Sequence, residues 1–357
     1  MKTFVYEGLP ARVLFGSGTL AQLGEEVGRL GIKRAVVLAT PQQESQARAL
    51  SDRLGALSAG VFAGATMHTP VERTEDALAF VRETGADGTV ALGGGSTIGL
   101  GKAIALRGGL PQIAIPTTYA GSEMTPIIGQ TENGVKTTQR TLAVLPKTVI
   151  YDVDLTLTLP AAISGTSGMN AIAHAVEALY AKDRNPVISL LAEDAIARLA
   201  KALPVIARDP DNAEARAAAL HGAWLCGMCL GSVGMALHHK LCHTLGGTFN
   251  LPHAETHAVV LPYALAYTAP AAPDAMAALS RALATGSPVT ALHDLSGRIG
   301  APRSLAELGM PKDGINRAAE LATANPYWNP RPIEYEGIRR VIAAAWSGEQ
   351  DPTRVAK

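Results

Sequence analysis

Short apolar runs alternate with amphipathic stretches over roughly the first 150 residues of the chain. The runs at 34–40, 88–92 and 112–115 are apolar enough to be buried strands of a parallel sheet. Between the runs, 45–54 and 75–84 carry apolar residues at helical spacing. Strands that alternate with helices predict a doubly wound parallel sheet.

The pattern changes after Asp154. Alanine, leucine and methionine dominate, and valine-rich runs nearly vanish. Pro160 suits the first turn of a helix. Helical spacing predicts helices at 161–182, 187–207, 213–230 and 276–285. We therefore expect an α/β domain over 1–155, followed by an all-α domain over 156–357.

Composition fits a globular protein with two hydrophobic cores, because 357 residues are many for one core. The 31 basic and 31 acidic residues give no net charge, so there is no long-range attraction for nucleic acid or anionic lipid. The N-terminus lacks the apolar stretch of a signal peptide, and no apolar run has the length of about 18 residues that a membrane span needs. We expect a cytoplasmic protein, and predict a homodimer that binds neither nucleic acid nor membrane.

Three cysteines are too few and too clustered for a disulfide framework: Cys226, Cys229 and Cys242. Cys226 and Cys229 have the spacing of a redox motif, but they lie in an apolar run. The sequence therefore predicts buried helix thiols.

A glycine cluster follows the second predicted strand and precedes a helical run. Glycines at such a turn let the backbone approach a pyrophosphate, and the new helix offers free N–H groups and a positive dipole end. The alternative is a tight turn that binds nothing, but the strand before and the helix after favour a phosphate site. A second polar segment follows the next strand and is predicted to add contacts. The predicted cofactor-binding residues of the two segments are Gly93, Gly94, Gly95, Ser96, Thr117, Thr118, Tyr119 and Ser122.

The glycine spacing differs from the GxGxxG of the common dinucleotide fold. The first strand run continues into Thr40-Pro41-Gln42-Gln43, without the carboxylate that normally binds the 2′-hydroxyl of NAD and repels NADP. The sequence favours a nicotinamide cofactor and leaves NADH and NADPH open.

Five of the nine histidines fall within one short stretch: His238, His239, His243, His253 and His257. On a helix His239 and His243 share a face, and Gly246-Gly247 are predicted to break that helix before His253. Such grouping predicts a shared site, which is either a metal bound by imidazoles or a general acid with anion-binding partners.

A sixth histidine, His174, lies four residues after Asn170, on a predicted helix that Thr166 or Ser167 could cap. Both side chains would share a face of that helix.

Several segments together resemble the iron-containing alcohol dehydrogenase superfamily, nearly end to end and in the same order. They are 93–96, 116–118, 121–123, 145–156, 168–177, 239–253 and 329–332. The resemblance implies the dehydroquinate synthase-like fold of a dinucleotide-binding α/β domain and a helical domain. Lys147 lies in a matched segment, and we predict it as a further cofactor-binding residue.

Members of that superfamily usually hold iron or zinc through one aspartate and three histidines. The histidines correspond to His174, His239 and His253, but Asn170 stands in place of the aspartate. A neutral amide is a poor ligand for a hard cation and removes the negative charge that would offset the metal. Asparagine here, with the 252–257 segment and Tyr119, resembles the maleylacetate reductases, which work without a metal.

The resemblance implies NADH- or NADPH-dependent reduction of maleylacetate, a small dicarboxylate, to 3-oxoadipate in aromatic-compound breakdown, with no metal. Hydride adds to the alkene carbon remote from the ketone, and an acid protonates the adjacent carbon. Imidazolium or another donor can stabilise the enolate oxygen. We predict His243 and His253 as catalytic. The predicted substrate-binding residues are His174, His239, His257, Asn170 and Arg331.

The nearest alternative is an iron- or zinc-dependent alcohol or polyol dehydrogenase on the same fold, because three imidazoles alone can bind zinc, and Asn170 weakens this alternative without excluding it. A lyase like dehydroquinate synthase is less compatible with the few cations around the histidines. A nucleotide-binding protein without catalysis is the third alternative.

Overall fold

The computed structural model describes residues 3–132, 135–325 and 327–356. The chain divides into two compact units, an α/β unit over Gly8–Leu159 and a helical unit that begins at Pro160. Residues 3–7 group with the helical unit, although nothing in their pattern indicates it. The division falls a few residues after the expected boundary at 155.

The α/β unit contains a six-stranded sheet in which every neighbouring pair is parallel. In spatial order the strands are β1 (Arg12–Phe15), β8 (Thr148–Tyr151), β5 (Gln112–Pro116), β4 (Gly88–Gly93), β2 (Ala35–Leu38) and β3 (Ser58–Phe62). The three predicted strands are β2, β4 and β5. A separate antiparallel hairpin joins β6 (Ile127–Glu132) to β7 (Val135–Arg140).

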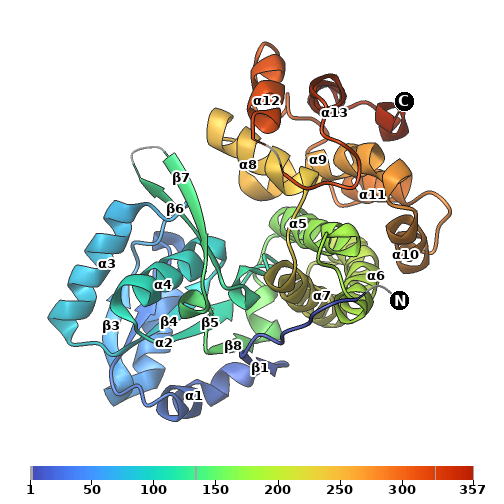
Figure 1. The fold of residues 1–357 in the computed structure, drawn as a ribbon. Helices are drawn as coiled ribbons and strands as arrows, with labels where there is room; N and C mark the ends of the chain where they lie inside the picture. Colours follow the sequence, from blue (N-terminus) through green and yellow to red (C-terminus); the bar gives the residue numbers. More distant parts are fainter. Residues whose placement is uncertain (1–2, 133–134, 326, 357) are drawn as a thin grey trace. The chain divides into compact units, whose positions relative to one another are not determined.

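Helices cover both faces of the sheet (Figure 1). Val37 and its neighbours of the same face pack with α1 (Leu23–Arg29) and α2 (Glu44–Leu54). Val36 and Leu38 pack on the other face with α3 (Val71–Thr84) and α4 (Gly95–Gly108). Successive side chains of a strand point to opposite faces, so a strand buried on both sides is apolar throughout. The doubly wound sheet is confirmed.

The helical unit has no strand among its described residues. Its helices are α5 (Ala161–Tyr180), α6 (Pro186–Arg208), α7 (Ala213–Ser232), α8 (Leu237–Phe249), α9 (His253–Thr268), α10 (Pro273–Leu283), α11 (Pro288–Arg298), α12 (Gly314–Thr323) and α13 (Tyr335–Ser347). The four predicted helices correspond to α5, α6, α7 and α10. Pro160 immediately precedes α5, as its fixed φ favours.

Two predictions about helix ends are wrong. Thr166 and Ser167 lie inside α5, where their hydroxyls donate to carbonyls one turn back instead of capping. Gly246 and Gly247 lie inside α8, which continues to Phe249 and ends at Asn250 with a φ of 53°. Leu245 is fully buried, and its packing against the rest of the unit offsets the modest helix-weakening effect of glycine.

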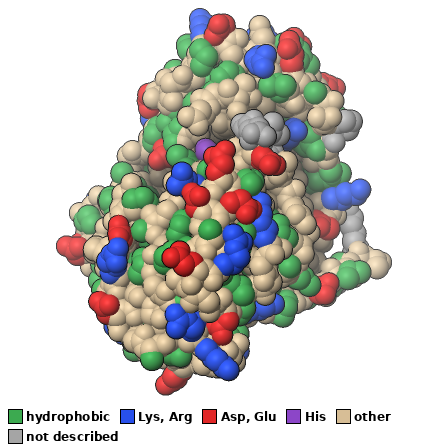
Figure 2. Space-filling model, turned by 90° about the vertical axis from the view of Figure 1, so that its left-hand side faces the viewer, with side chains coloured by type: hydrophobic (Ala, Val, Ile, Leu, Met, Phe, Trp, Pro, Cys, Tyr) green, Lys and Arg blue, Asp and Glu red, His purple; other side chains and the backbone are tan. Residues whose placement is uncertain are grey.

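The three cysteines are buried and free, as predicted. Burial raises the pKa of each thiol. Basic and acidic side chains are intermixed on the face shown in Figure 2. Among the described residues no single helix is long and apolar enough to cross a membrane, although α7 and α8 pass that test as a pair bent by 95°.

Candidate active site

The glycine turn joins β4 to α4. Gly93 has a φ of 151°, and a Cβ there would lie 2.5 Å from Thr97 Oγ1. A Cβ on Gly94 would lie 3.0 Å from Thr118 Cγ2. The backbone and packing of the chain therefore require glycine at position 93, whereas a side chain at position 94 would require Thr118 to shift.

Gly95 is different, because a Cβ there would meet nothing within 4 Å. It is exposed and stands at the first position of α4, followed by Ser96. The first N–H groups of a helix have no partner within the helix. Open space over such a helix start suits close approach of a phosphate, so the turn fits a dinucleotide.

The second polar segment is tied to this turn. Thr117 N donates to Gly93 O at 3.1 Å, and Gln43 Nε2 donates to Thr117 Oγ1 at 3.1 Å. The segments after β2, β4 and β5 thus meet at the carboxyl edge of the sheet, where open α/β sheets bind their ligands. Thr118 lies against Gly94, whereas Tyr119 is fully buried.

Lys102 holds the segment that contains Ser122. Its amine is buried and donates to Ser122 O, Thr125 O and Ile127 O at 2.5 to 2.8 Å. Burial lowers the pKa of Lys102 to about 7, an effect that Glu123 partly offsets. Lys102 therefore positions a loop next to the turn.

The structure does not bring Lys147 to the glycine turn. Lys147 precedes β8, and its backbone N–H donates to Gln112 O at the amino end of β5. Because all these strands are parallel, the turn lies at the opposite edge, about 13 Å away along a strand. The sequence indicated that a lysine adjoins a strand, but not at which edge of the sheet.

In the helical unit, α5, α8 and α9 bring six histidines together. Neighbouring rings have centroids 4.4 to 6.4 Å apart. The cluster comprises His174 from α5, His238, His239 and His243 from α8, and His253 and His257 from α9. We call these six residues the histidine cluster.

A line of hydrogen bonds runs through the first part of the histidine cluster. His239 Nδ1 lies 2.7 Å from Glu177 Oε2, and His239 Nε2 lies 2.7 Å from His174 Nδ1. Glu177 is completely buried. Its role was missed from the sequence, although the spacing of Asn170, His174 and Glu177 already puts all three on one helix face.

A second pair lies beside this line. His238 Nε2 is 3.0 Å from His257 Nδ1, and Cys242 Sγ is 3.7 Å from the same His238 nitrogen. Burial, followed by the neighbouring histidines, lowers the pKa of both rings well below the usual value. Among the described side chains, His238 Nδ1, His257 Nε2 and Asn170 Oδ1 are buried atoms without a hydrogen-bond partner.

His243 and His253 are the exposed members of the histidine cluster, and the other four are buried. Their rings are stacked, with centroids 6.4 Å apart and an interplanar angle of 21°. His253 is the first residue of α9, where the helix dipole favours an anion. The two predicted catalytic residues are thus the members of the histidine cluster that are exposed to solvent.

Arg331 is placed elsewhere. Its guanidinium donates to Tyr267 O at 3.1 Å and stacks over the Tyr267 ring at 4.3 Å. Tyr267 is ten residues after His257 on α9, which corresponds to about 15 Å along the helix. The structure therefore places Arg331 toward the far end of α9 from His257, where it anchors the 329–332 segment.

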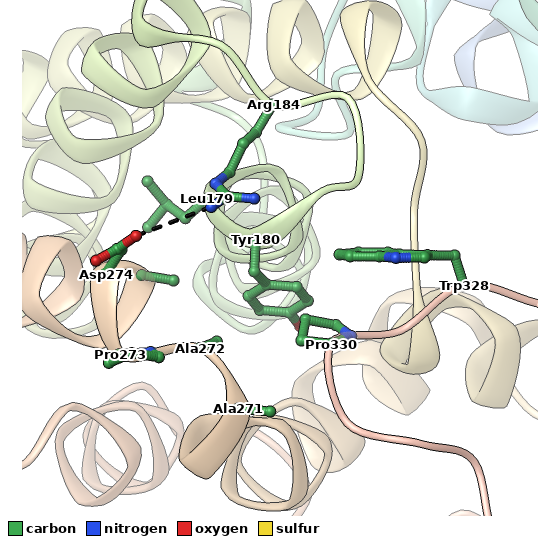
Figure 3. A pocket seen from close by; sticks show the side chains of 10 residues that line it. Leu179, Tyr180, Arg184, Ala271, Ala272, Pro273, Asp274, Trp328 and Pro330 are labelled. Atoms are coloured by element: carbon green, nitrogen blue, oxygen red, sulfur yellow. Dashed lines mark ion pairs between the residues drawn. The ribbon is translucent and has the colours of Figure 1, made fainter. Parts of the chain in front are cut away.

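A pocket of about 300 Å³ opens in the helical unit beyond the end of α5 (Figure 3). Tyr180 and Trp328 line it, and Arg184 forms an ion pair with Asp274 at 3.8 Å on its rim. None of the described residues that line it is a histidine. The polar side chains that lie close together in this unit are instead those of the histidine cluster, which is the candidate active site.

The metal-ligand positions of the family do not fit a metal ion as they stand. Two nitrogens on one tetrahedral zinc lie about 3.3 Å apart, whereas His174 Nδ1 and His239 Nε2 are in direct contact at 2.7 Å. Asn170 supplies no charge. Among the described residues the set of donors that converges within 4.8 Å is His238, Cys242 and His257. There burial raises the pKa of the Cys242 thiol, which opposes the thiolate that a metal requires.

A parallel-sheet unit with a phosphate turn, joined in sequence to a helical unit with a histidine cluster, defines a dinucleotide-dependent oxidoreductase. Two family models match the chain: iron-containing alcohol dehydrogenase over residues 10–153, and the C-terminal part of the Fe-containing alcohol dehydrogenase family over 164–346. The chain belongs to the iron-containing alcohol dehydrogenase family.

Individual relatives have names more specific than that of the family. Maleylacetate reductase of Rhizobium sp. (strain MTP-10005) is 58% identical over 98% of this chain and 99% of its own length. The crystal structure of maleylacetate reductase from Agrobacterium tumefaciens is 57% identical, with a TM-score of 0.95 over 98% of this chain and 100% of that one. A putative alcohol dehydrogenase from Ralstonia eutropha JMP134 is also 57% identical, with a TM-score of 0.97 and the same coverage.

Proposed function

We propose that this oxidoreductase reduces the conjugated carbon–carbon double bond of maleylacetate to give 3-oxoadipate, with NADH or NADPH and without a metal. The observation that carries the proposal is the direct contact of His174 with His239, next to Asn170. A hydrogen-bonded imidazole pair stands where the family places a metal. Relatives named maleylacetate reductase, at 49–58% identity over 97–98% of the chain, support the substrate.

A nicotinamide cofactor held at Gly95 and Ser96 would supply the hydride. Hydride addition to the alkene carbon remote from the ketone leaves an enolate oxygen. His243 and His253 are the exposed imidazoles that donate to this oxygen, a type of interaction worth about 10² to 10³ in turnover. The start of α9 at His253 also suits a carboxylate of the substrate.

The alternative on the same fold is a metal-dependent alcohol dehydrogenase, and one solved relative is named a putative alcohol dehydrogenase. Carbonyl reduction of that kind relies on a Lewis acid at the carbonyl oxygen. An alkene conjugated to a ketone needs only an oxyanion donor and a proton donor, which imidazoles provide. The chemistry of the donors present therefore favours maleylacetate.

The test is NADH and NADPH oxidation, followed by absorbance, with maleylacetate or propanal as substrate. We expect turnover with maleylacetate to exceed that with propanal by orders of magnitude, and added zinc or ferrous ion not to raise it. Comparable turnover with propanal, or activity that appears only with metal, would overturn the proposal.

A further inference from the structure

The three helices that carry the histidine cluster contain few charged side chains besides the histidines. α5, α8 and α9 together have one lysine, Lys240 of α8, and no arginine. Their acidic residues are Glu177 and Glu255, and the ion pairs found among the described residues include none between Lys240 and either of them. Lys240 is therefore a cation without a recorded counter-charge, next to a site proposed to bind a doubly anionic substrate.

Lys240 lies on the face of α8 that is directed to solvent. Residues three or four apart share one face of a helix. Lys240 is half-buried and His243 and Gly247 are exposed, whereas Leu241 and Leu245 are buried on the opposite side of α8. A Cβ at Gly247 would meet nothing within 4 Å, so the face stays open beyond His243. A small ligand can therefore contact Lys240 and His243 together.

An aromatic ring supports the Lys240 side chain. Lys240 Nζ lies over the Tyr327 ring, 5.7 Å from its centroid, which is within the range of a cation–π contact. Burial, followed by the charge of Glu177, raises the pKa of Tyr327, so the phenol stays neutral near neutral pH. The contact therefore holds Lys240 in place without neutralising its charge.

We propose that Lys240 binds the substrate carboxylate that lies nearer to the ketone. This inference rests on the proposed function, in which His243 donates to the enolate oxygen. In maleylacetate a single methylene separates the ketone from that carboxylate, so the donors to the two groups must be neighbours. Lys240 and His243 are, because they stand one turn apart on the same face of α8. The other carboxylate lies across the alkene, and the start of α9 suits it.

Lys240 thus takes the role that the sequence suggested for Arg331, whose guanidinium is bound to Tyr267 O toward the far end of α9. The chain has no net charge, so attraction for a dianion must come from a cation within the site. A substrate without a carboxylate gains nothing from Lys240. The site therefore favours keto acids over plain carbonyl compounds.

The test compares two substrates that differ only in this carboxylate. The second substrate, cis-4-oxopent-2-enoate, keeps the alkene, the ketone and the remote carboxylate of maleylacetate, but ends in a methyl group. Lys240→Met removes the charge and keeps an unbranched stem, and Lys240→Arg keeps the charge. The matched control is Lys312→Met, because Lys312 Nζ also lies over an aromatic ring, 5.6 Å from the centroid of Trp346.

We expect Lys240→Met to raise KM for maleylacetate about 10- to 100-fold and to leave kcat nearly unchanged, because the carboxylate is bound equally before and during the reaction. KM for cis-4-oxopent-2-enoate should be the same in Lys240→Met and the wild type. Lys240→Arg should keep most of the affinity for maleylacetate, and Lys312→Met should keep the wild-type values. A purely structural role of Lys240 would affect both substrates equally.

An unchanged KM for maleylacetate in Lys240→Met, or an equal rise for both substrates, would overturn the inference. If the wild type does not reduce maleylacetate, the proposed function fails instead. Calorimetric titration with 3-oxoadipate requires no turnover, so it still tests Lys240: the dissociation constant should rise in Lys240→Met as KM does, and an unchanged value would show that Lys240 binds no carboxylate.

Discussion

His238 Nε2 lies 3.0 Å from His257 Nδ1, and both rings are completely buried. Burial first, and then the charge of neighbouring histidines, lowers the pKa of each ring well below 6.5. Both rings are therefore neutral in the folded protein near neutral pH, with one nitrogen of the contact donating and the other accepting.

This pair predicts acid sensitivity. In the unfolded chain both imidazoles become protonated once the pH falls below 6.5. In the folded protein they stay neutral until a lower pH, because the pKa of each ring is lowered. The stabilising effect of the neutral rings is complete above pH 6.5 and is lost as the pH falls, by about 1.4 kcal/mol per pH unit for each histidine. The free energy of unfolding, measured with urea, should therefore be lower at pH 5.5 than at pH 7.5.

His257→Asn removes one titrating ring from the pair, so its stability should depend less steeply on pH than that of the wild type. Other histidines with lowered pKa, His221 and His293, contribute equally to both proteins. Equal pH dependence in the two proteins would contradict neutral burial of His257.

Gly95 is the position that best tests the cofactor site. Gly95→Val places a side chain in open space over the start of α4, so the fold should persist and cofactor affinity should fall at least about tenfold. Gly94→Val is less informative, since its Cβ would also press on Thr118. Gly24→Val in α1 is the control, because a Cβ there also meets nothing within 4 Å. An unchanged dissociation constant from fluorescence titration of Gly95→Val would remove this turn from the site.

The strands of the sheet could be predicted where a strand is recognisable from its own continuous apolar run. β2, β4 and β5 are central strands, buried on both faces, so their apolar runs are continuous. The edge strand β3 is half-buried along its length, and β1 pairs with β8, more than a hundred residues away. The hydrophobic pattern of a single segment does not indicate which distant strand it pairs with.

The site was predictable to a similar extent. The helical spacing of the histidines was enough to predict that they form one site. Which of them are hydrogen-bonded to one another depends on how α5 packs against α8. Glu177 could be identified only once its oxygens were seen against His239 and two backbone N–H groups. Lys147 and Arg331 were attributed to the site by residue type, which carries no information on the end of a strand or helix at which they lie.

Metal content offers an independent prediction. Wild-type protein purified without chelator should hold well under one equivalent of iron or zinc and keep its activity after dialysis against a strong chelator. Asn170→Asp restores a negative charge next to His174, so zinc retained after dialysis should rise about tenfold or more. Stoichiometric metal in the wild type, with activity lost on chelation and regained with that metal, would reinstate the alcohol dehydrogenase alternative.

The last prediction concerns the two exposed histidines. If His243 or His253 donates to the enolate oxygen, its replacement by alanine should lower kcat about 10²- to 10³-fold. A residue that only binds the substrate carboxylate should raise KM and leave kcat nearly unchanged. Both side chains are exposed, so the melting temperature of either variant should stay close to that of the wild type. The stacked rings lie close enough to share one oxygen ligand, so the double variant should lose less than the product of the two single losses. Steady-state kinetics of the two single variants and the double variant decide the matter, and wild-type kcat and KM in both single variants would remove His243 and His253 from the reaction.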